Sequence, residues 1–337
     1  MRRPAICAAS SATESVLGKK LGVDLGTSTI RVVTRGDGVL IAEPAVVAVR
    51  EGEVSVSLLG TAALEAAAND RSLELRHPLH GGDIRDRRGL AALIHHAVNR
   101  AVGRQRIFKP DLVIAVRAGM SGNDRRVVLE AAARSGSRTV YLIDAAIAAA
   151  MGAGIAVTSP RAHLVIDIGA GKTDLAVLAL EGTVAGRSLV TGADDLFDRL
   201  AAHIGMTHGV VVDRAQMRDA AHILVAASHE ERTMDVGGVL ISSYEIAPLV
   251  AEYLRPLDLA LTEILAETPG ALRQDVRGAG IVLTGGGARL EGLERHVAMV
   301  AGCSARVATD PEGCTVRGTA LAVENLDVLR RNFMYIR

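Results

Sequence analysis

Apolar residues along this chain form two kinds of run. Short β-branched runs bounded by glycine or charged residues are typical of buried strands, whereas runs with apolar residues every three or four positions are typical of helices. The first pattern predicts strands at 45–49, 112–116, 140–143 and 281–284, with weaker strand signals at 53–59. The second predicts helices at 90–102, 124–135, 145–152, 194–203, 243–267, 290–300 and 318–325. Strands that alternate with helices indicate mostly parallel sheets covered by helices.

Two segments share one pattern, which predicts a duplicated core. They are LGVDLGTSTIRVVT at 21–34 and LVIDIGAGKTDLAVL at 164–178. In each, an apolar strand ends in an aspartate, a glycine-rich turn follows, and a second β-branched strand leaves the turn. Glycine turns after aspartate are common in hairpins, so coincidence is the alternative. Both halves also continue with strands and helices in alternation, which favours an α/β protein of two similar halves.

The two glycine-rich turns carry the candidate chemistry. Backbone N–H groups of tight glycine turns can converge on one oxyanion because no Cβ blocks the approach, and nearby hydroxyl groups add donors. Two such turns facing each other would clamp a polyphosphate, and Asp24 and Asp167 could then hold the waters of an octahedral Mg²⁺. The expected phosphate-binding residues are Gly26, Thr27, Ser28, Thr29, Gly169, Ala170, Gly171, Lys172 and Thr173.

A third glycine-rich element consists of Gly285, Gly286 and Gly287, which follow one predicted strand and precede a predicted helix. Bare backbone at a helix N-terminus suits a nucleoside or an α-phosphate. No Walker A loop, Gly-x-x-x-x-Gly-Lys-(Ser/Thr), occurs, because the segment Gly-Ala-Gly-Lys-Thr lacks the first glycine of that pattern. Lys172 therefore either reaches a phosphate or is a solvated turn lysine, and the missing spacing favours the second interpretation.

Composition and charge exclude several classes of function. Lys+Arg and Asp+Glu both number 38, and only 2% of residues are aromatic, so neither a basic field nor a stacking surface is offered to nucleic acid. Three cysteines without paired spacing argue for a reducing cytoplasm and against disulfides or zinc. The apolar stretch at 145–157 is too short to span a bilayer. Residues 1–19 lack the apolar run of a signal peptide and are expected to form a flexible tail.

Together, these segments resemble the MreB family within the actin, Hsp70 and sugar-kinase superfamily. The resemblance runs from about residue 20 over nearly the whole length. Arginine greatly outnumbers lysine, and the nearest resemblance is to the shortened, Mbl-type proteins of filamentous actinobacteria. The motifs that carry it are LGVDLGTSTIRVV, IAEPAVVAV, IFKPDLVIAV, YLIDAAIAAAMGAGI, HLVIDIGAGKTDLAVLALEG, GADDLFDRLAAHI, IVLTGGGARLEGLE and GTALAVENLDVLRR.

The resemblance implies an actin-like ATPase fold, with duplicated ribonuclease-H-like domains and two lobes around a nucleotide cleft. Lobe I would take residues 20–160 with 303–337 returning to it, and lobe II would take 161–302. The two turns would bind the phosphates of ATP, and Asp24 and Asp167 would bind Mg²⁺ through water. The glycines at 285–287 would bind adenosine, with Gly192 and Asp194 beside the ribose.

The resemblance also implies a biological setting. A protein of this kind would be cytoplasmic and peripheral on the inner face of the plasma membrane. It would form filaments with itself or with a full-length MreB. Together with cell-wall morphogenesis proteins, it would organise wall synthesis and set the shape of the cell or spore.

Three departures from the family pattern modify these expectations. The family's Glu-Glu-Pro, whose second glutamate positions the attacking water, here reads Asp144-Ala145-Ala146, which predicts weak or absent hydrolysis unless Asp144 substitutes. The family's nucleoside clamp is largely erased at 212–219, where Arg218 and Asp219 could replace part of it. Residues 213–243 are too few for the usual outer subdomain of lobe II, which makes longitudinal filament contacts.

Ile107 and Phe108 are the candidate membrane contact. They are flanked by Arg104, Arg106 and Lys109, at the place where MreB proteins carry an apolar membrane-inserting pair. An apolar tip ringed by cations suits an anionic bilayer surface. The alternative is that this pair starts the following strand and faces the core.

Other functions stay open from the sequence. A nucleotide-independent adaptor would co-assemble with a full-length MreB. A phosphotransferase resembling sugar kinases or acetate kinase would need an acceptor pocket and a catalytic carboxylate, and the chain is short for most such kinases. An Hsp70-type chaperone is disfavoured because no β-rich peptide-binding domain follows residue 337.

Overall fold

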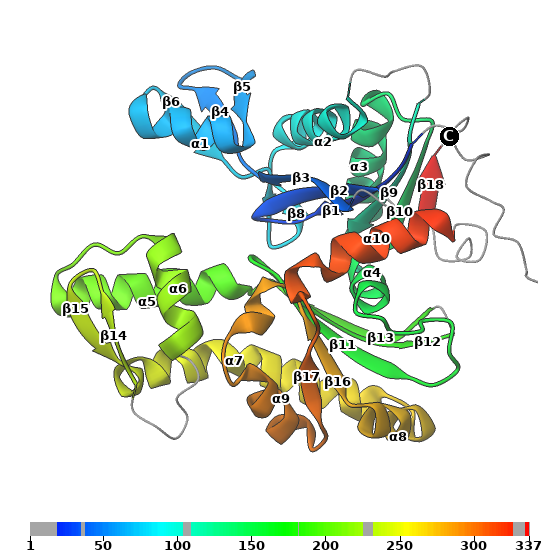
Figure 1. Ribbon diagram of the computed structural model, residues 1–337, viewed down its shortest axis with the longest axis vertical. Coiled ribbons are helices and arrows are strands. Elements are labelled where there is room, and N and C mark those ends of the chain that lie inside the picture. Colours follow the sequence, from blue (N-terminus) through cyan, green and yellow to red (C-terminus); the bar gives the residue numbers. More distant parts are fainter. Residues whose placement is uncertain are drawn as a thin grey trace, which may run out of the picture.

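The computed structural model of the chain describes residues 19–34, 38–103, 109–180, 182–224, 232–325 and 334–336. Two β-sheets lie one above the other along the long axis, each with helices against its faces (Figure 1). Helices α4 (Ala145–Gly152) and α10 (Cys314–Glu324) lie between the sheets. None of the helices in the described residues has the length and apolar character needed to cross a bilayer.

The first sheet has the strand order β18-β10-β9-β1-β2-β3. Strands β1, β9 and β10 are parallel, while β2, β3 and β18 run antiparallel to their neighbours. Its strands are β1 (Lys20–Leu25), β2 (Thr29–Thr34), β3 (Gly38–Pro44), β9 (Asp111–Val116), β10 (Thr139–Asp144) and β18 (Met334–Ile336).

Helices cover both faces of this first sheet, so every residue of β9 is buried. Successive side chains of a strand point to opposite faces. Leu112 accordingly packs in the cluster formed with α2 (Arg87–Val102) and α3 (Gly122–Arg134), whereas Val113 packs with α4 and α10.

The second sheet repeats this topology with the order β13-β12-β11-β16-β17. In both sheets, an antiparallel unit of three strands is followed by two strands parallel to the first of them. The predicted duplicated α/β core is therefore confirmed. The elements of this half are β11 (His163–Ile168), β12 (Thr173–Ala179), β13 (Gly182–Leu189), β16 (Ile281–Thr284), β17 (Ala305–Val307), α5 (Ala193–His208), α7 (Ser243–Glu267), α8 (Gly270–Ala279) and α9 (Leu293–Ala301).

Helices α4 and α10 approach each other at backbone distance. A Cβ at Gly318 of α10 would lie 1.7 Å from the carbonyl oxygen of Ala148, and one at Gly152 of α4 would lie 1.8 Å from the carbonyl oxygen of Cys314. Only glycine fits at these two positions without moving backbone. The small residues of α4 therefore serve helix packing, and α10 returns the late part of the chain to the first sheet, where it packs on β1.

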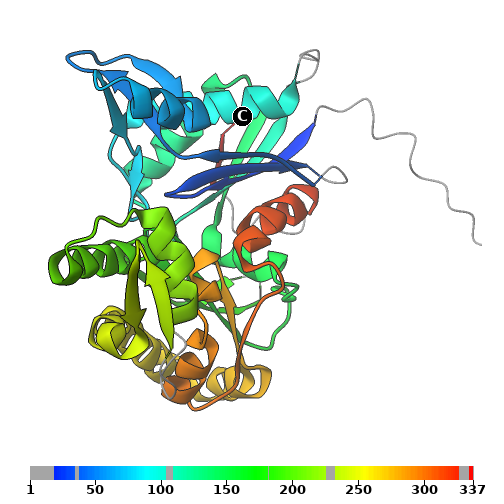
Figure 2. The same cartoon turned by 60° about the vertical axis from the view of Figure 1, so that its left-hand side comes forward.

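Each half carries smaller peripheral elements. Those of the first half are β4 (Val47–Arg50), β5 (Val56–Leu59), α1 (Gly60–Asn69), β6 (Leu73–Arg76), β7 (Leu79–His80) and β8 (Asp83–Ile84). In the second half, α6 (Arg214–Leu224) packs against α5, and the hairpin of β14 (Thr233–Val236) and β15 (Val239–Ser242) packs against α6 and α7 (Figure 2). In its described residues, 213–224 and 232–243, the stretch expected to be too short for an outer subdomain thus holds one helix and one hairpin.

The predicted element bounds agree with the structure where the local pattern is strong, as for α4, α7 and β16. Helix α9 begins at Leu293 rather than at residue 290, because Gly286–Arg289 form a 3-10 helix, η2, and Gly292 has a left-handed backbone. Helix α10 begins four residues before its predicted start, after the 3-10 helix η3 (Pro311–Gly313). Helix α1 was not predicted, because only Gly60 and Ala63 of it are buried and no apolar stripe marks it.

Candidate functional site

A cleft lies between the two sheets, and both glycine-rich turns open into it. It encloses about 1030 Å³ of space not filled by protein, including its open mouth. The predicted residues that line it are Asp24, Gly26, Thr27, Ser28, Thr29, Asp167, Gly169, Ala170, Lys172, Asp194, Arg218, Gly285, Gly286 and Gly287. Gly171, Thr173, Gly192 and Asp144 are not among the lining residues. The tertiary structure therefore joins most of the predicted site from two distant halves of the chain.

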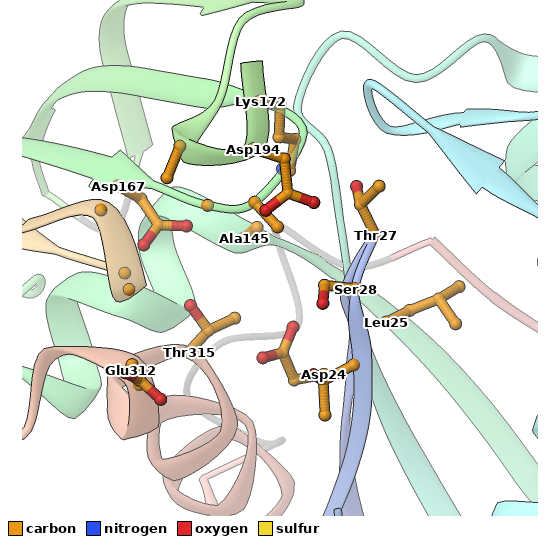
Figure 3. Close-up of a pocket in the computed structure, with 18 of the residues that line it drawn as sticks. Asp24, Leu25, Thr27, Ser28, Ala145, Asp167, Lys172, Asp194, Glu312 and Thr315 are labelled. Atoms are coloured by element: carbon orange, nitrogen blue, oxygen red, sulfur yellow. The ribbon is translucent and has the colours of Figure 1, made fainter. Parts of the chain in front are cut away.

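Asp24 and Asp167 face the same cavity from opposite sides (Figure 3). The pKa of Asp24 is raised to about 6, chiefly by burial and also by the charge of Asp167, against the opposite influence of Arg31. Burial also raises the pKa of Asp167, against the opposite influence of Lys172. The hydroxyl group of Thr284 donates a hydrogen bond to Oδ1 of Asp167 at 2.9 Å. Both carboxylates are thus in an environment that disfavours their charge.

This pair of carboxylates fits a magnesium ion that arrives with a ligand. Mg²⁺ is commonly bound through one or two carboxylates together with phosphate oxygens and water. Among the described residues there is no cluster of three or more His, Cys, Asp or Glu that could hold a metal ion alone. An ion at Asp24 and Asp167 would therefore take its remaining ligands from water and phosphate.

The second turn is braced by the start of α5. The backbone N–H of Ala193 donates to the carbonyl of Gly169, and that of Asp194 donates to the carbonyl of Ala170, both at 2.9 Å. A Cβ at Gly192 would lie 2.2 Å from the carbonyl oxygen of Ala170. Gly192 therefore allows α5 to approach the turn. It is not among the residues that line the cleft, and its predicted place beside the ribose stays a prediction.

Thr173 and Lys172 have partners within the protein. The Thr173 hydroxyl group donates to the carbonyl of Thr191 at 2.8 Å, and Thr173 does not line the cleft, so its predicted contact with a phosphate is not supported. The ammonium group of Lys172 pairs with Asp174, and 14% of the Lys172 side chain is exposed. Lys172 also lines the cleft, so the interpretation as a solvated turn lysine is wrong.

The glycine triplet continues from β16 into η2 rather than into a helix N-terminus. Gly285 has a φ of +81°, and a Cβ there would lie 2.3 Å from the carbonyl oxygen of Ile168. Glu312 lies over the next glycine, since a Cβ at Gly286 would be 3.5 Å from its Cγ. The predicted α-helix begins only at Leu293, so the bare backbone of the triplet, and not a helix dipole, faces the cleft.

The structure argues against a role for Asp144 in hydrolysis. Its Oδ1 accepts a hydrogen bond from Nη2 of Arg125 at 2.8 Å, and the side chain does not line the cleft. Ala145, which begins α4, does line the cleft. The position expected to orient water thus carries a methyl group.

At the ribose side, Arg218 lines the cleft and Asp219 does not. The Asp219 side chain is 77% exposed and lies 3.9 Å from Nε of Arg218. Burial raises the pKa of Asp194, while Arg214, which lies 3.2 Å away, lowers it. Arg218 therefore faces the cleft, and its predicted contact with the nucleoside stays a prediction.

Several residues of the cleft were missed from the sequence. Arg31 is the cross-strand partner of Asp24 on β2, at 3.8 Å between Nη1 and Oδ2, and this could have been found by assuming a regular hairpin register. Glu312 lies 3.6 Å from Arg31 and 3.1 Å from Arg289, and thus links the two halves. Arg117 also lines the cleft, and no local signal marked it or Glu312.

The predicted membrane pair Ile107 and Phe108 lies outside the described residues, as does nearly all of the tail at 1–19. Both expectations stay predictions.

Comparison with known proteins agrees with the geometry. The family model described as MreB/Mbl protein matches residues 18–331. Mbl of Bacillus subtilis is 28% identical over 328 residues, which cover 93% of this chain and 98% of the relative. MreB of Escherichia coli K12 is 29% identical over 326 residues, which cover 91% of this chain and 94% of the relative. Both are named as cell shape-determining proteins.

Two solved structures are similar over most of their length. MreB 5 of Spiroplasma citri bound to AMPPNP has a TM-score of 0.82 at 25% identity, with coverage of 94% of this chain and 98% of that one. A MamK double helical filament has a TM-score of 0.74 at 23% identity, with coverage of 90% of this chain and 98% of that one. The fold is therefore the actin-like fold predicted from the motifs, and the chain belongs to the MreB/Mbl family.

Proposed function

We propose that this protein is a cytoskeletal member of its family that binds ATP with Mg²⁺ in the cleft between its two lobes. The observation that carries the proposal is the convergence of Asp24, Asp167 and both glycine-rich turns on one cavity. A cation shared by Asp24 and Asp167 would offset the charge of both carboxylates. The occupant of the cleft would be anionic and chelating, because its oxygens would supply further ligands to that cation. The AMPPNP in the similar MreB 5 of Spiroplasma citri supports this choice of ligand.

Each part of the cleft has a separate task in this proposal. Backbone N–H groups of Gly26 and Ala170, which both line the cleft, would bind phosphate oxygens. Asp24 and Asp167 would hold Mg²⁺ through water, and the ion would offset the phosphate charge. The bare backbone of the triplet 285–287 would carry the nucleoside, with Arg218 at its edge.

The cellular role follows from the family. The relatives in Bacillus subtilis and Escherichia coli are named as cell shape-determining proteins. The protein would therefore assemble into filaments with itself or with a full-length MreB. It would act in the cytoplasm, peripherally on the inner face of the plasma membrane, and organise cell-wall morphogenesis proteins.

A second candidate is an adaptor that co-assembles with a full-length MreB and hydrolyses no ATP. Ala145 in the cleft wall and the turn of Asp144 toward Arg125 favour it, because no carboxylate at that junction is free to orient water. In its extreme form, such an adaptor would bind no nucleotide at all.

Equilibrium binding of fluorescent ATP, with Mg²⁺ and with EDTA, separates these functions. We expect Mg²⁺-dependent binding by the parent protein and at least about tenfold weaker binding by Asp24→Ala and Asp167→Ala. Glu65→Ala removes an exposed carboxylate on α1 and is the matched control. Absence of measurable affinity in the folded parent protein would exclude the nucleotide-dependent function and leave the nucleotide-independent adaptor.

A further inference from the structure

Arg117 is a partly buried cation that lines the cleft. It directly follows β9, and 15% of its side chain is exposed. Its Nη2 donates a hydrogen bond to Oδ1 of Asp83 at 2.5 Å. Within the described part of the chain, the Nε of Arg117 is buried and has no hydrogen-bond partner. A Cβ at Gly82 would lie 3.1 Å from this Nε, so the atom packs against Gly82, and a ligand in the cleft would meet the terminal nitrogens of the guanidinium group.

The backbone holds Arg117 in a fixed place. The N–H of Met120 donates to the carbonyl of Arg117 at 3.0 Å, which closes a turn after β9. Nη2 of Arg125 donates to the carbonyl of Ala118 at 2.8 Å and secures the same turn. The guanidinium group of Arg117 is therefore attached to a rigid base rather than to a free loop.

Arg117 lies at the end of the cleft that would hold the phosphates in the proposed function. Strands β1, β9 and β10 are parallel, so their carboxyl ends meet at one edge, where Asp24 pairs in register with Ala115 and Asp144 pairs with Val116. Arg117 follows Val116, the last residue of β9, and so lies just beyond the carboxyl ends of these strands. A Cβ at Gly82 would lie 2.9 Å from Cδ of Arg117 and 3.2 Å from Cδ of Lys172, so the two cationic side chains flank the same glycine.

We propose that Arg117 binds the terminal phosphate of the bound nucleotide and thereby favours a nucleoside triphosphate over a diphosphate. This inference rests on the proposed nucleotide binding. A guanidinium group presents several donors in a planar fork that matches phosphate geometry, and here Asp83 holds Nη2 while Arg117 lines the cleft. In the proposed function the nucleoside lies at the glycine triplet 285–287, whereas Arg117 lies beside Lys172 of the second glycine-rich turn.

The test compares ATP and ADP affinities of the full chain in Mg²⁺ buffer. For Arg117→Leu we expect the ATP affinity to fall about tenfold or more, and the ADP affinity to change by less than about twofold. Arg117→Lys keeps a charge but lacks the planar fork of donors, so we expect an intermediate loss for ATP alone. Arg126→Leu removes the same charge from an exposed position on α3 and should leave both affinities unchanged.

The outcomes separate this inference from the function on which it rests. If the parent protein binds neither nucleotide, the proposed nucleotide function fails and the inference fails with it. If the parent binds both, and Arg117→Leu weakens them equally or not at all while its thermal unfolding matches the parent, only the role of Arg117 is refuted. A selective loss of ATP affinity supports it.

Discussion

A Cβ at Gly171 would lie 2.8 Å from Cγ2 of Thr27. These residues belong to the two glycine-rich turns, so the turns of opposite halves are in direct contact at this point. Gly171 is not among the residues that line the cleft, and its predicted contact with phosphate stays a prediction. Its role in the structure is to let the second turn approach the first.

Substitution of Gly171 should therefore separate the turns. We expect Gly171→Ala to lower the ATP affinity roughly tenfold, because both turns must reach the same phosphates. Thr27→Ser removes the methyl group nearest to the new Cβ, so the double variant should recover much of the affinity. Fluorescent nucleotide titration of the single and double variants measures this coupling. Purely additive losses would contradict the contact as its cause.

Asp24 should make the stability of the nucleotide-free protein depend on pH. Its pKa is raised from 3.8 to about 6 in the folded state, so the folded state holds the proton more tightly than the unfolded chain. The stabilisation from this group is complete below pH 3.8 and is lost as the pH rises through about 6. Asp24→Asn, which cannot ionise, should therefore gain stability relative to the parent by roughly 1 kcal/mol between pH 5 and pH 7.5.

Urea unfolding in EDTA at several pH values measures this difference. Glu65→Gln, which alters an exposed carboxylate on α1, is the control and should follow the parent curve. A constant offset between Asp24→Asn and the parent over this range would show that Asp24 is not the group responsible.

Replacement of a glycine by alanine at the contact between α4 and α10 should lower the stability of the fold. Gly318→Ala places a methyl group 1.7 Å from the carbonyl oxygen of Ala148 and should cost at least about 2 kcal/mol of unfolding free energy. Gly278→Ala in α8 meets no heavy atom within 4 Å and should instead stabilise the helix by roughly 0.5 to 1 kcal/mol. Chemical denaturation of both variants gives the comparison. Equal effects would mean that α10 does not pack as described.

Hydrolysis should be limited by the residue at the start of α4. We expect the parent protein to release phosphate slowly, and Ala145→Glu to raise the rate by about tenfold or more, because it adds a base in the cleft wall. Asp144→Asn should leave the rate unchanged, since this side chain faces Arg125. The measurement is phosphate release at saturating ATP. An unchanged rate in Ala145→Glu, with ATP affinity retained, would locate the defect elsewhere.

Membrane association should depend on Ile107 and Phe108. Their replacement in Ile107→Ser with Phe108→Ser should abolish co-sedimentation with anionic liposomes, because an apolar tip no longer inserts. Leu259→Ser with Met299→Ser removes two apolar side chains that are 56% and 74% exposed on lobe II, and should not change sedimentation. Undiminished sedimentation of the first variant would exclude that pair as the anchor.

The sequence by itself determined the parts that depend on local pattern. Strand and helix periodicity gave α4, α7 and β16 their bounds, because each is set by short-range burial and backbone preference. The repeated aspartate and glycine turn predicted the duplicated core, because the same local hairpin was present twice. The motif set also predicted the family, which the match over residues 18–331 confirms.

The tertiary structure alone decided which side chains share the cleft. Arg117 and Glu312 become neighbours of the glycine turns only after strands distant in sequence are paired. Asp144 stands at the expected strand end, yet Arg125 from α3 draws it away, and Gly192 and Thr173 serve backbone contacts instead of the cavity. Such outcomes depend on competition among long-range partners, and local spacing carries no information about which partner prevails.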